Sequence, residues 1–223
     1  MSAERDAELP GRLLRSERDV FLPLLRAAPE ADFSLPTASC PDWNVRQVLA
    51  HCGAALTRII EGRLERGVYS DASNAADVAE RDDWPLARVL DELERGMTEA
   101  GPLIAGHTHG RLDTVALGEW VHAGDVRDAW GLPGAYADTS AGGDVPALLV
   151  IASTVRKDTP RVEVALTDAS PATLSLGNVH EDRAPATLTA DTPTLIRLYT
   201  GRPLAASSYV LEGASPDELC IYG

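Results

Sequence analysis

The apolar residues of this chain change their spacing near residue 140, and this change constrains the fold more than any other feature. Before it, four stretches have the helical spacing of three and four residues, at 11–28, 45–66, 85–105 and 114–130. After a short helical stretch, three runs alternate with period two, at 162–166, 172–176 and 186–190. We therefore predict an α+β protein of two domains, with a four-helix bundle over residues 1–140 and a small α+β domain over residues 141–223.

Caps and turn residues set the bounds of the predicted elements. Asn44 stands where its side chain can cap the helix at 45–66, and Gly67 is a natural stop for that helix. Proline, glycine and polar residues predict loops and a linker at 29–44, 68–84 and 131–144. The remaining predicted elements are helices at 145–157 and 193–200 and strands at 209–211 and 219–222.

Charge and cysteine content limit the classes of partner. The formal net charge is −14, which excludes nucleic acid and anionic membranes as main partners, because both bind basic surfaces. No apolar run reaches the roughly 18 residues of a membrane span, and the first ten residues lack the apolar core of a signal peptide. Cys40, Cys52 and Cys220 are scattered, and Cys52 is expected to pack in the core. We expect a cytoplasmic monomer or homodimer with a small-molecule substrate.

The segment 118–127 places ionisable residues on the apolar side of a predicted helix. Residues three and four apart share a helix face, so Glu119, His122 and Asp125 lie along one side. Glu119 and His122 are expected to point into the protein, where an unpaired charge is costly. A metal ion suits a carboxylate and an imidazole together, and His51 on a neighbouring helix of the bundle is the best third ligand. Three protein ligands leave an open position, as in a catalytic site.

Other interpretations of these residues stay open. His51 alone fits a histidine at the edge of the core that is satisfied by a backbone carbonyl, and Glu119 with His122 fits a buried ion pair. The His-x-His pair at 107–109 is a rival metal site, although we expect a solvated turn there. Asp125 could replace Glu119 as a ligand or accept a hydrogen bond from the ring of His122, and we predict the second role.

Three segments resemble one known family. Residues 43–51 resemble the Trp-x-Val-x-x-Val-Leu-x-His segment of the mycothiol-dependent maleylpyruvate isomerase family, whose bundle is of the DinB-like type. Residues 119–127 resemble that family's second segment, particularly in actinobacterial members that read His-x-x-Asp-Ile-Arg. Residues 192–202 are similar to the helix and Gly-Arg end of its sterol-carrier-like C-terminal domain.

The resemblance implies a divalent metal, usually zinc, and a low-molecular-weight thiol as co-substrate. In that family the metal is held by one histidine of the second helix and by a glutamate and a histidine of the fourth. These residues carry over to His51, Glu119 and His122. In the isomerase itself the glutamate stands four residues before the histidine, and here that position is Gly118. Both spacings place the glutamate on the face of the histidine.

Two function classes follow from this resemblance. The first is a metal-dependent enzyme that uses mycothiol or a similar thiol for isomerisation of an activated alkene or S-transfer to a small electrophile. In it Asp125 orients His122, and Arg127 and Arg202 bind carboxylates of substrate or thiol, although a solvated surface charge is an equal alternative for both arginines. The second is a non-catalytic small-molecule-binding or regulatory protein with a degenerate metal site.

Overall fold

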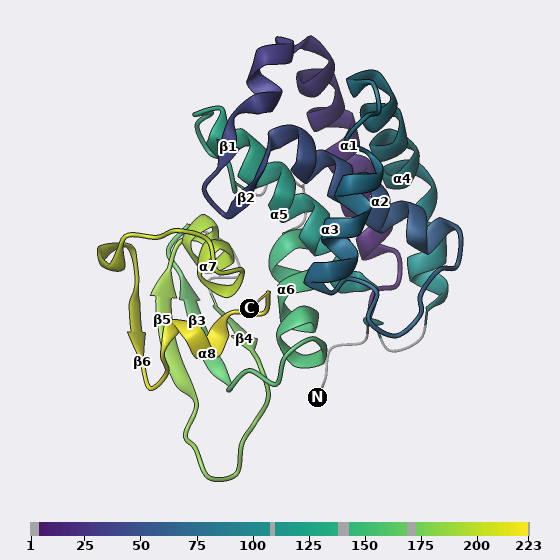
Figure 1. Ribbon diagram of the computed structural model, residues 1–223. Coiled ribbons are helices and arrows are strands. Elements are labelled where there is room, and N and C mark those ends of the chain that lie inside the picture. The colour runs from purple at the N-terminus through teal and green to yellow at the C-terminus, as the bar shows by residue number, and fades with distance from the viewer. Residues whose placement is uncertain (1–4, 108–109, 138–142, 169–172, 223) are drawn as a thin grey trace. The chain divides into compact units, whose positions relative to one another are not determined.

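Asn44 begins the helix that carries His51. Its side chain accepts a hydrogen bond from the backbone N–H of Gln47 at 3.0 Å, and the Gln47 side chain accepts one from the backbone N–H of Asn44 at 3.1 Å. Such a capping box satisfies two N–H groups that a helix start leaves without a partner. The computed structural model describes residues 5–107, 110–137, 143–168 and 173–222, and it shows this helix, α2, over Val45–Ile60 (Figure 1).

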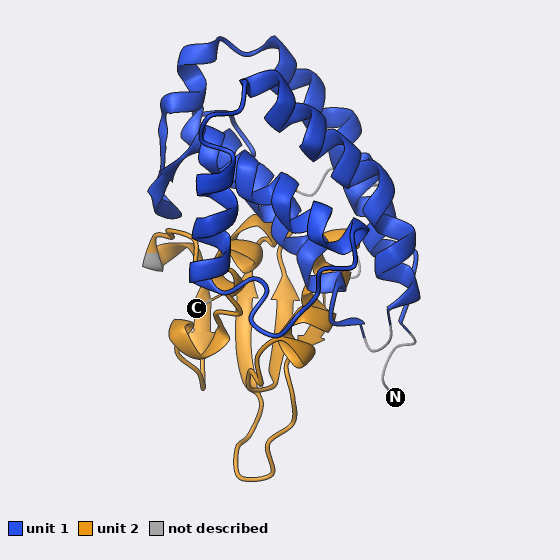
Figure 2. Cartoon of the chain, turned by 45° about the vertical axis from the view of Figure 1, so that its right-hand side comes forward, with its two compact units in different colours: residues 1–135 blue, residues 136–223 orange. Residues whose placement is uncertain are grey.

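The chain divides into two compact units, residues 1–135 and 136–223 (Figure 2). The elements of the first unit are α1 (Leu9–Ala27), the 3-10 helix η1 (Glu30–Ser34), β1 (Pro36–Thr37), β2 (Cys40–Asn44), α2, α3 (Asp71–Glu80), α4 (Leu86–Gly106) and α5 (Asp113–Ala129). The long helices α1, α2, α4 and α5 pack together, with α4 against both α1 and α2, and α5 against α1 and α2. Their apolar faces are buried between them.

Helix α2 ends earlier than predicted. Gly62 has a φ of +69°, a left-handed conformation that favours glycine, and the helix stops at Ile60 before it. The predicted end at residue 66, before Gly67, is therefore wrong. Helix α2 packs closely against α4. A Cβ added at Gly96 of α4 would lie only 2.6 Å from the Cβ of Leu56 on α2.

Helix α3 lies in the segment 68–84, which we predict to be irregular. It buries little apolar surface, and two ion pairs connect its end to the neighbouring helices. Arg58 of α2 contacts both carboxylate oxygens of Asp77, at 2.7 and 2.8 Å. Arg81, which directly follows α3, contacts both carboxylate oxygens of Glu92 on α4, at 2.6 and 2.7 Å. The prediction of an irregular segment is wrong because α3 has no apolar stripe that the sequence could reveal. Ion pairs attach this helix to its neighbours instead.

A short hairpin of β1 and β2 replaces part of the loop predicted at 29–44. Thr37 pairs with Cys40 across the hairpin, and its buried hydroxyl donates to the backbone carbonyls of Cys40 at 3.0 Å and Trp43 at 2.9 Å. These bonds hold the start of β2 in one position. They matter for the site, since the hairpin carries both Cys40 and Trp43.

The second unit is a sheet with helices. Its elements are α6 (Asp144–Val155), β3 (Val162–Leu166), β4 (Thr173–Leu176), β5 (Ala186–Ala190), α7 (Thr192–Tyr199), the 3-10 helix η3 (Ala206–Ser208), β6 (Val210–Glu212) and α8 (Pro216–Leu219). The strand order is β4-β3-β5-β6, with β3 and β5 parallel and the other neighbours antiparallel. Alternate residues of β3 and β5 are buried, as their period-two pattern predicts. Helix α6 packs against β4 and α7.

The strand predicted at 219–222 is wrong, because Leu219 is the last residue of α8 and residues 220–222 form no strand. Ser215 and Glu218 make a capping box, and Pro216 occupies the first turn, where a helix tolerates proline. Part of the predicted linker, residues 138–142, lies outside the described residues, as does residue 172 of a predicted strand. The α+β fold with two domains is confirmed. In the described part of the chain, no helix is long and apolar enough to cross a membrane.

Candidate metal centre

His51 lies on the buried face of α2 and contacts α5 and the hairpin. Its ring centroid is 5.2 Å from that of His122 in an edge-to-face arrangement and 5.1 Å from that of Trp43. The residue is 9% exposed, and among the described residues Nδ1 has no hydrogen-bond partner. Burial, and secondly the charge of His122, lower the pKa of His51 to about 3. The imidazole is therefore neutral at pH 7, the form in which histidine binds metals.

Glu119 lies on α5 and is 2% exposed. Burial raises its pKa to about 7, and the charge of His122 and a hydrogen bond from the Cys52 thiol act in the opposite direction. Its Oε2 atom has no hydrogen-bond partner among the described residues. Cys52 is buried as predicted, but it does more than fill space, since its thiol donates to Glu119. Burial, and secondly the charge of Glu119, raise the pKa of Cys52 well above its usual range.

His122 is half-buried and stands on α5 three residues after Glu119 and three residues before Asp125. Its Nδ1 atom is 2.9 Å from Oδ2 of Asp125, one turn further along the helix. The Asp125 side chain is fully buried. A contact of this kind fixes the orientation of an imidazole ring and leaves its other nitrogen to point away from the carboxylate.

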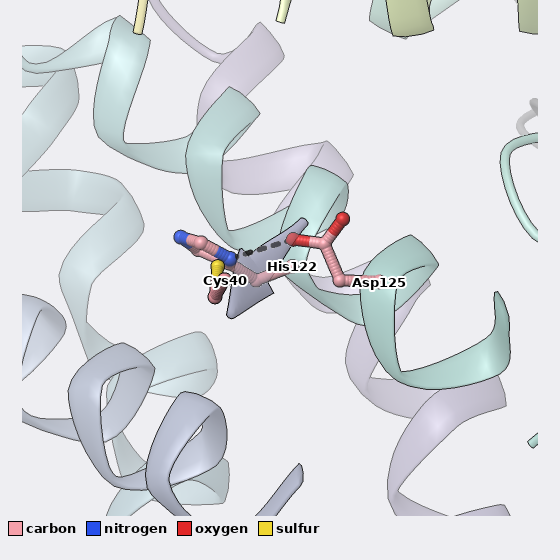
Figure 3. A group of neighbouring side chains, drawn as sticks. All are labelled: Cys40, His122 and Asp125. Carbon is pink, nitrogen blue, oxygen red and sulfur yellow. Dashed lines mark hydrogen bonds and ion pairs between the residues drawn. The ribbon is translucent and has the colours of Figure 1, made fainter. Parts of the chain in front are cut away.

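Cys40 also reaches this neighbourhood. One ligand atom each from Cys40, His122 and Asp125 lie within 4.8 Å of one another (Figure 3). No other group of three potential metal ligands is this close among the described residues, so His51 and Glu119 do not form a second one with His122. Sequence reasoning missed Cys40, because hairpin pairing brings it to α5 and no helical spacing connects the two. The ligand set of His51, Glu119 and His122 stays a prediction.

The two arginines with predicted carboxylate-binding roles both have partners within their own units. Arg127 of α5 forms a buried ion pair with Glu17 of α1 and stacks over the ring of Phe21. It would have to leave Glu17 to bind a substrate. Arg202 of the second unit donates to the backbone carbonyl of Thr200 at 2.6 Å. Their predicted roles stay predictions.

The rival histidine pair gains no support from the structure. His107 follows the last turn of α4, where its backbone N–H donates to the carbonyl of Ile104 at 3.0 Å. His109 lies outside the described residues. The candidate centre is built by α2, β2 and α5, and the ring of His51 contacts the rings of both Trp43 and His122.

Comparisons with known proteins agree with the resemblance of the sequence. The family model of the mycothiol maleylpyruvate isomerase N-terminal domain matches residues 14–130, more than half of the chain. Crystal structures of the mycothiol-dependent maleylpyruvate isomerase and of a histidine-to-alanine mutant match with TM-scores of 0.55 and 0.56, at 12% identity and 95% coverage of both chains. No curated protein sequence matches. At this identity the structures show a shared fold, and it is the family model that assigns the chain: it belongs to the mycothiol-dependent maleylpyruvate isomerase family.

Proposed function

We propose that this protein is a metal-dependent enzyme that uses mycothiol or a similar low-molecular-weight thiol. Its reaction is isomerisation of an activated alkene or S-transfer to a small electrophile. His51, Glu119 and His122 hold a divalent metal, which we expect to be zinc. The observation that carries the proposal is the pair of buried atoms without partners, Nδ1 of His51 and Oε2 of Glu119, on the two helices that bring His51 and His122 together.

The donor chemistry of these residues suits a bound cation, and their ligand atoms would have to move closer together than they lie in the structure to hold one. Each buried polar atom without a partner costs about 1–3 kcal/mol, so two of them next to a half-buried histidine call for a ligand. The nitrogens of two imidazoles and the oxygen of one carboxylate are a donor set of catalytic zinc sites. A divalent metal held by these residues would keep the co-substrate in its nucleophilic thiolate form at neutral pH.

The chain itself contributes position and shielding. Asp125 holds the ring of His122 through Nδ1, which keeps the ring from rotating. Trp43 lies against His51 and limits the access of water to its ring. The thiol of Cys52 keeps the carboxylate of Glu119 turned toward α2. In an isomerisation the co-substrate thiolate adds to the alkene, the resulting single bond rotates, and the thiolate leaves again.

A non-catalytic binding or regulatory protein is the second candidate. The observation that favours it is Gly118, which stands where the isomerase has its glutamate. With the glutamate displaced by one residue, the metal would bind weakly, and the protein would bind a small molecule without converting it. A protein of this class should show no turnover, whether or not a metal and a thiol are supplied.

Metal content per chain, measured by mass spectrometry on untagged protein, tests the proposal. At the position formed by His51, Glu119 and His122 we expect about one equivalent of zinc, and this equivalent should be lost in His51→Ala and His122→Ala. His180→Ala, in the second unit, is the matched control and should leave zinc content unchanged. Turnover should require both a thiol and metal returned to the chelated protein. A wild type that stays metal-free when zinc is supplied would support the binding protein instead.

A further inference from the structure

Cys40, His122 and Asp125 form a cluster of potential ligands that differs from the set proposed above. Cys40 begins β2, whereas His122 and Asp125 lie one turn apart on α5 (Figure 3). Their ligand atoms are all within 4.8 Å of one another, and the ring Nδ1 of His122 is 2.9 Å from Oδ2 of Asp125. A sulfur, a nitrogen and an oxygen therefore converge on a volume that one ion could fill.

The backbone holds Cys40 at this place. Thr37, which is 1% exposed, pairs with Cys40 in the hairpin and donates its hydroxyl to the Cys40 carbonyl. The residue Cys40 is half-buried and not sealed in the core. The Asp125 side chain is fully buried, and a buried carboxylate is stabilised when a cation lies beside it. The cluster thus combines a fixed thiol, a buried carboxylate and a histidine that the carboxylate orients.

We propose that Cys40, His122 and Asp125 form a sulfur-containing metal position that takes a thiophilic divalent ion such as zinc. As the ion binds, the Cys40 thiol releases its proton to solvent and the metal–sulfur bond forms. A thiolate ligand favours zinc or cadmium and disfavours magnesium and calcium, which prefer oxygen. The inference rests on the proposed function only through His122, since His51 and Glu119 take no part in this position.

Cobalt(II) provides the test, because a cobalt–thiolate bond gives an intense charge-transfer band in the near ultraviolet. We expect this band in the cobalt-loaded wild type without any added thiol, and its loss in Cys40→Ser. Cys220→Ser is the matched control, at a cysteine of the same burial class in the second unit, and should keep the band. His51→Ala and Glu119→Gln should also keep it. As a second measurement on the wild type, zinc should protect Cys40 from alkylation in peptide mapping, and leave Cys220 reactive.

Several results would overturn this inference. The first is that cobalt binds without giving a sulfur band. The second is that the band survives in Cys40→Ser and disappears in Cys52→Ser. The third is that zinc does not slow the alkylation of Cys40. A band lost in both Cys40→Ser and His51→Ala would overturn the separate position, because one ion would then have both ligands. Metal lost in His51→Ala without any sulfur band would refute only this inference. A sulfur band and metal content unchanged in His51→Ala would refute only the ligand set proposed above.

Discussion

Replacing Glu119 with glutamine is expected to change how the stability of the metal-free protein depends on pH. Burial raises the pKa of Glu119 from its ordinary value of 4.5 to about 7 in the folded protein. In the unfolded chain the carboxyl is exposed and ionises at its ordinary value. Between these two values the folded protein keeps a proton that the unfolded chain has lost, so raising the pH favours unfolding.

The size of the effect follows from the two pKa values. An interval from 4.5 to about 7, at about 1.4 kcal/mol per pH unit, amounts to about 3 kcal/mol of unfolding free energy lost as the pH rises. Glutamine does not ionise, so Glu119→Gln should lack this loss. His51 acts in the opposite direction, because its pKa is lowered from 6.5 to about 3 and stability therefore rises with pH through that range. Both proteins contain His51, and subtraction removes its contribution.

The measurement is urea unfolding of wild type and Glu119→Gln, followed by tryptophan fluorescence in the presence of a chelator from pH 4.5 to 7. The difference in unfolding free energy should move in favour of the variant by about 3 kcal/mol across this interval. With saturating zinc the wild type should lose this disadvantage, because a cation beside Glu119 favours its ionised form. Parallel curves without metal would refute the inference that burial raises the pKa of Glu119.

Three further predictions concern the frame of the site, and urea unfolding checks each of them. Asn44→Ala removes the capping box of α2 and should cost about 1 kcal/mol. Arg81→Met leaves the half-buried carboxylate of Glu92 without its bidentate partner and should cost about 3 kcal/mol, and an unchanged stability would mean that α3 does not depend on this pair. Gly96→Ala places a methyl group 2.6 Å from a side chain of α2 and should cost about 1–3 kcal/mol, whereas the control Gly106→Ala on the same helix meets no atom within 4 Å and should not destabilise.

The long helices and central strands could be predicted because each one carries its own apolar period. Helix α3 could not, since its stability depends on Arg58 and Arg81, whose partners are 19 and 11 residues away in the sequence. The end of α2 at Ile60 also escaped prediction, because several glycines can stop a helix and Gly62 competes with Gly67 for that role. Local sequence patterns therefore predict where elements lie better than where they end.

For the site, the sequence predicts the two histidines better than their neighbours. His51 and His122 lie on apolar faces of helices that pack together, so their approach follows from amphipathicity alone. The contact between His122 and Asp125 follows from helical spacing. Cys40 reaches α5 through hairpin pairing, and Cys52 donates to a carboxylate of another helix. Neither contact has a signature in local spacing, so only the structure could reveal them.

The surroundings of Glu119 argue against its being the relic of a lost site. His51 and Cys52 are adjacent on α2, and they contact His122 and Glu119 on α5 respectively. Glu119 therefore faces α2, where it accepts a hydrogen bond from Cys52, the neighbour of His51 in the sequence. At neutral pH the carboxyl is expected to lower the stability of the metal-free protein by about 3 kcal/mol, a cost that an apolar residue would avoid. A buried ionisable group that weakens the fold is typical of a functional site, which supports the metal position proposed for His51, Glu119 and His122.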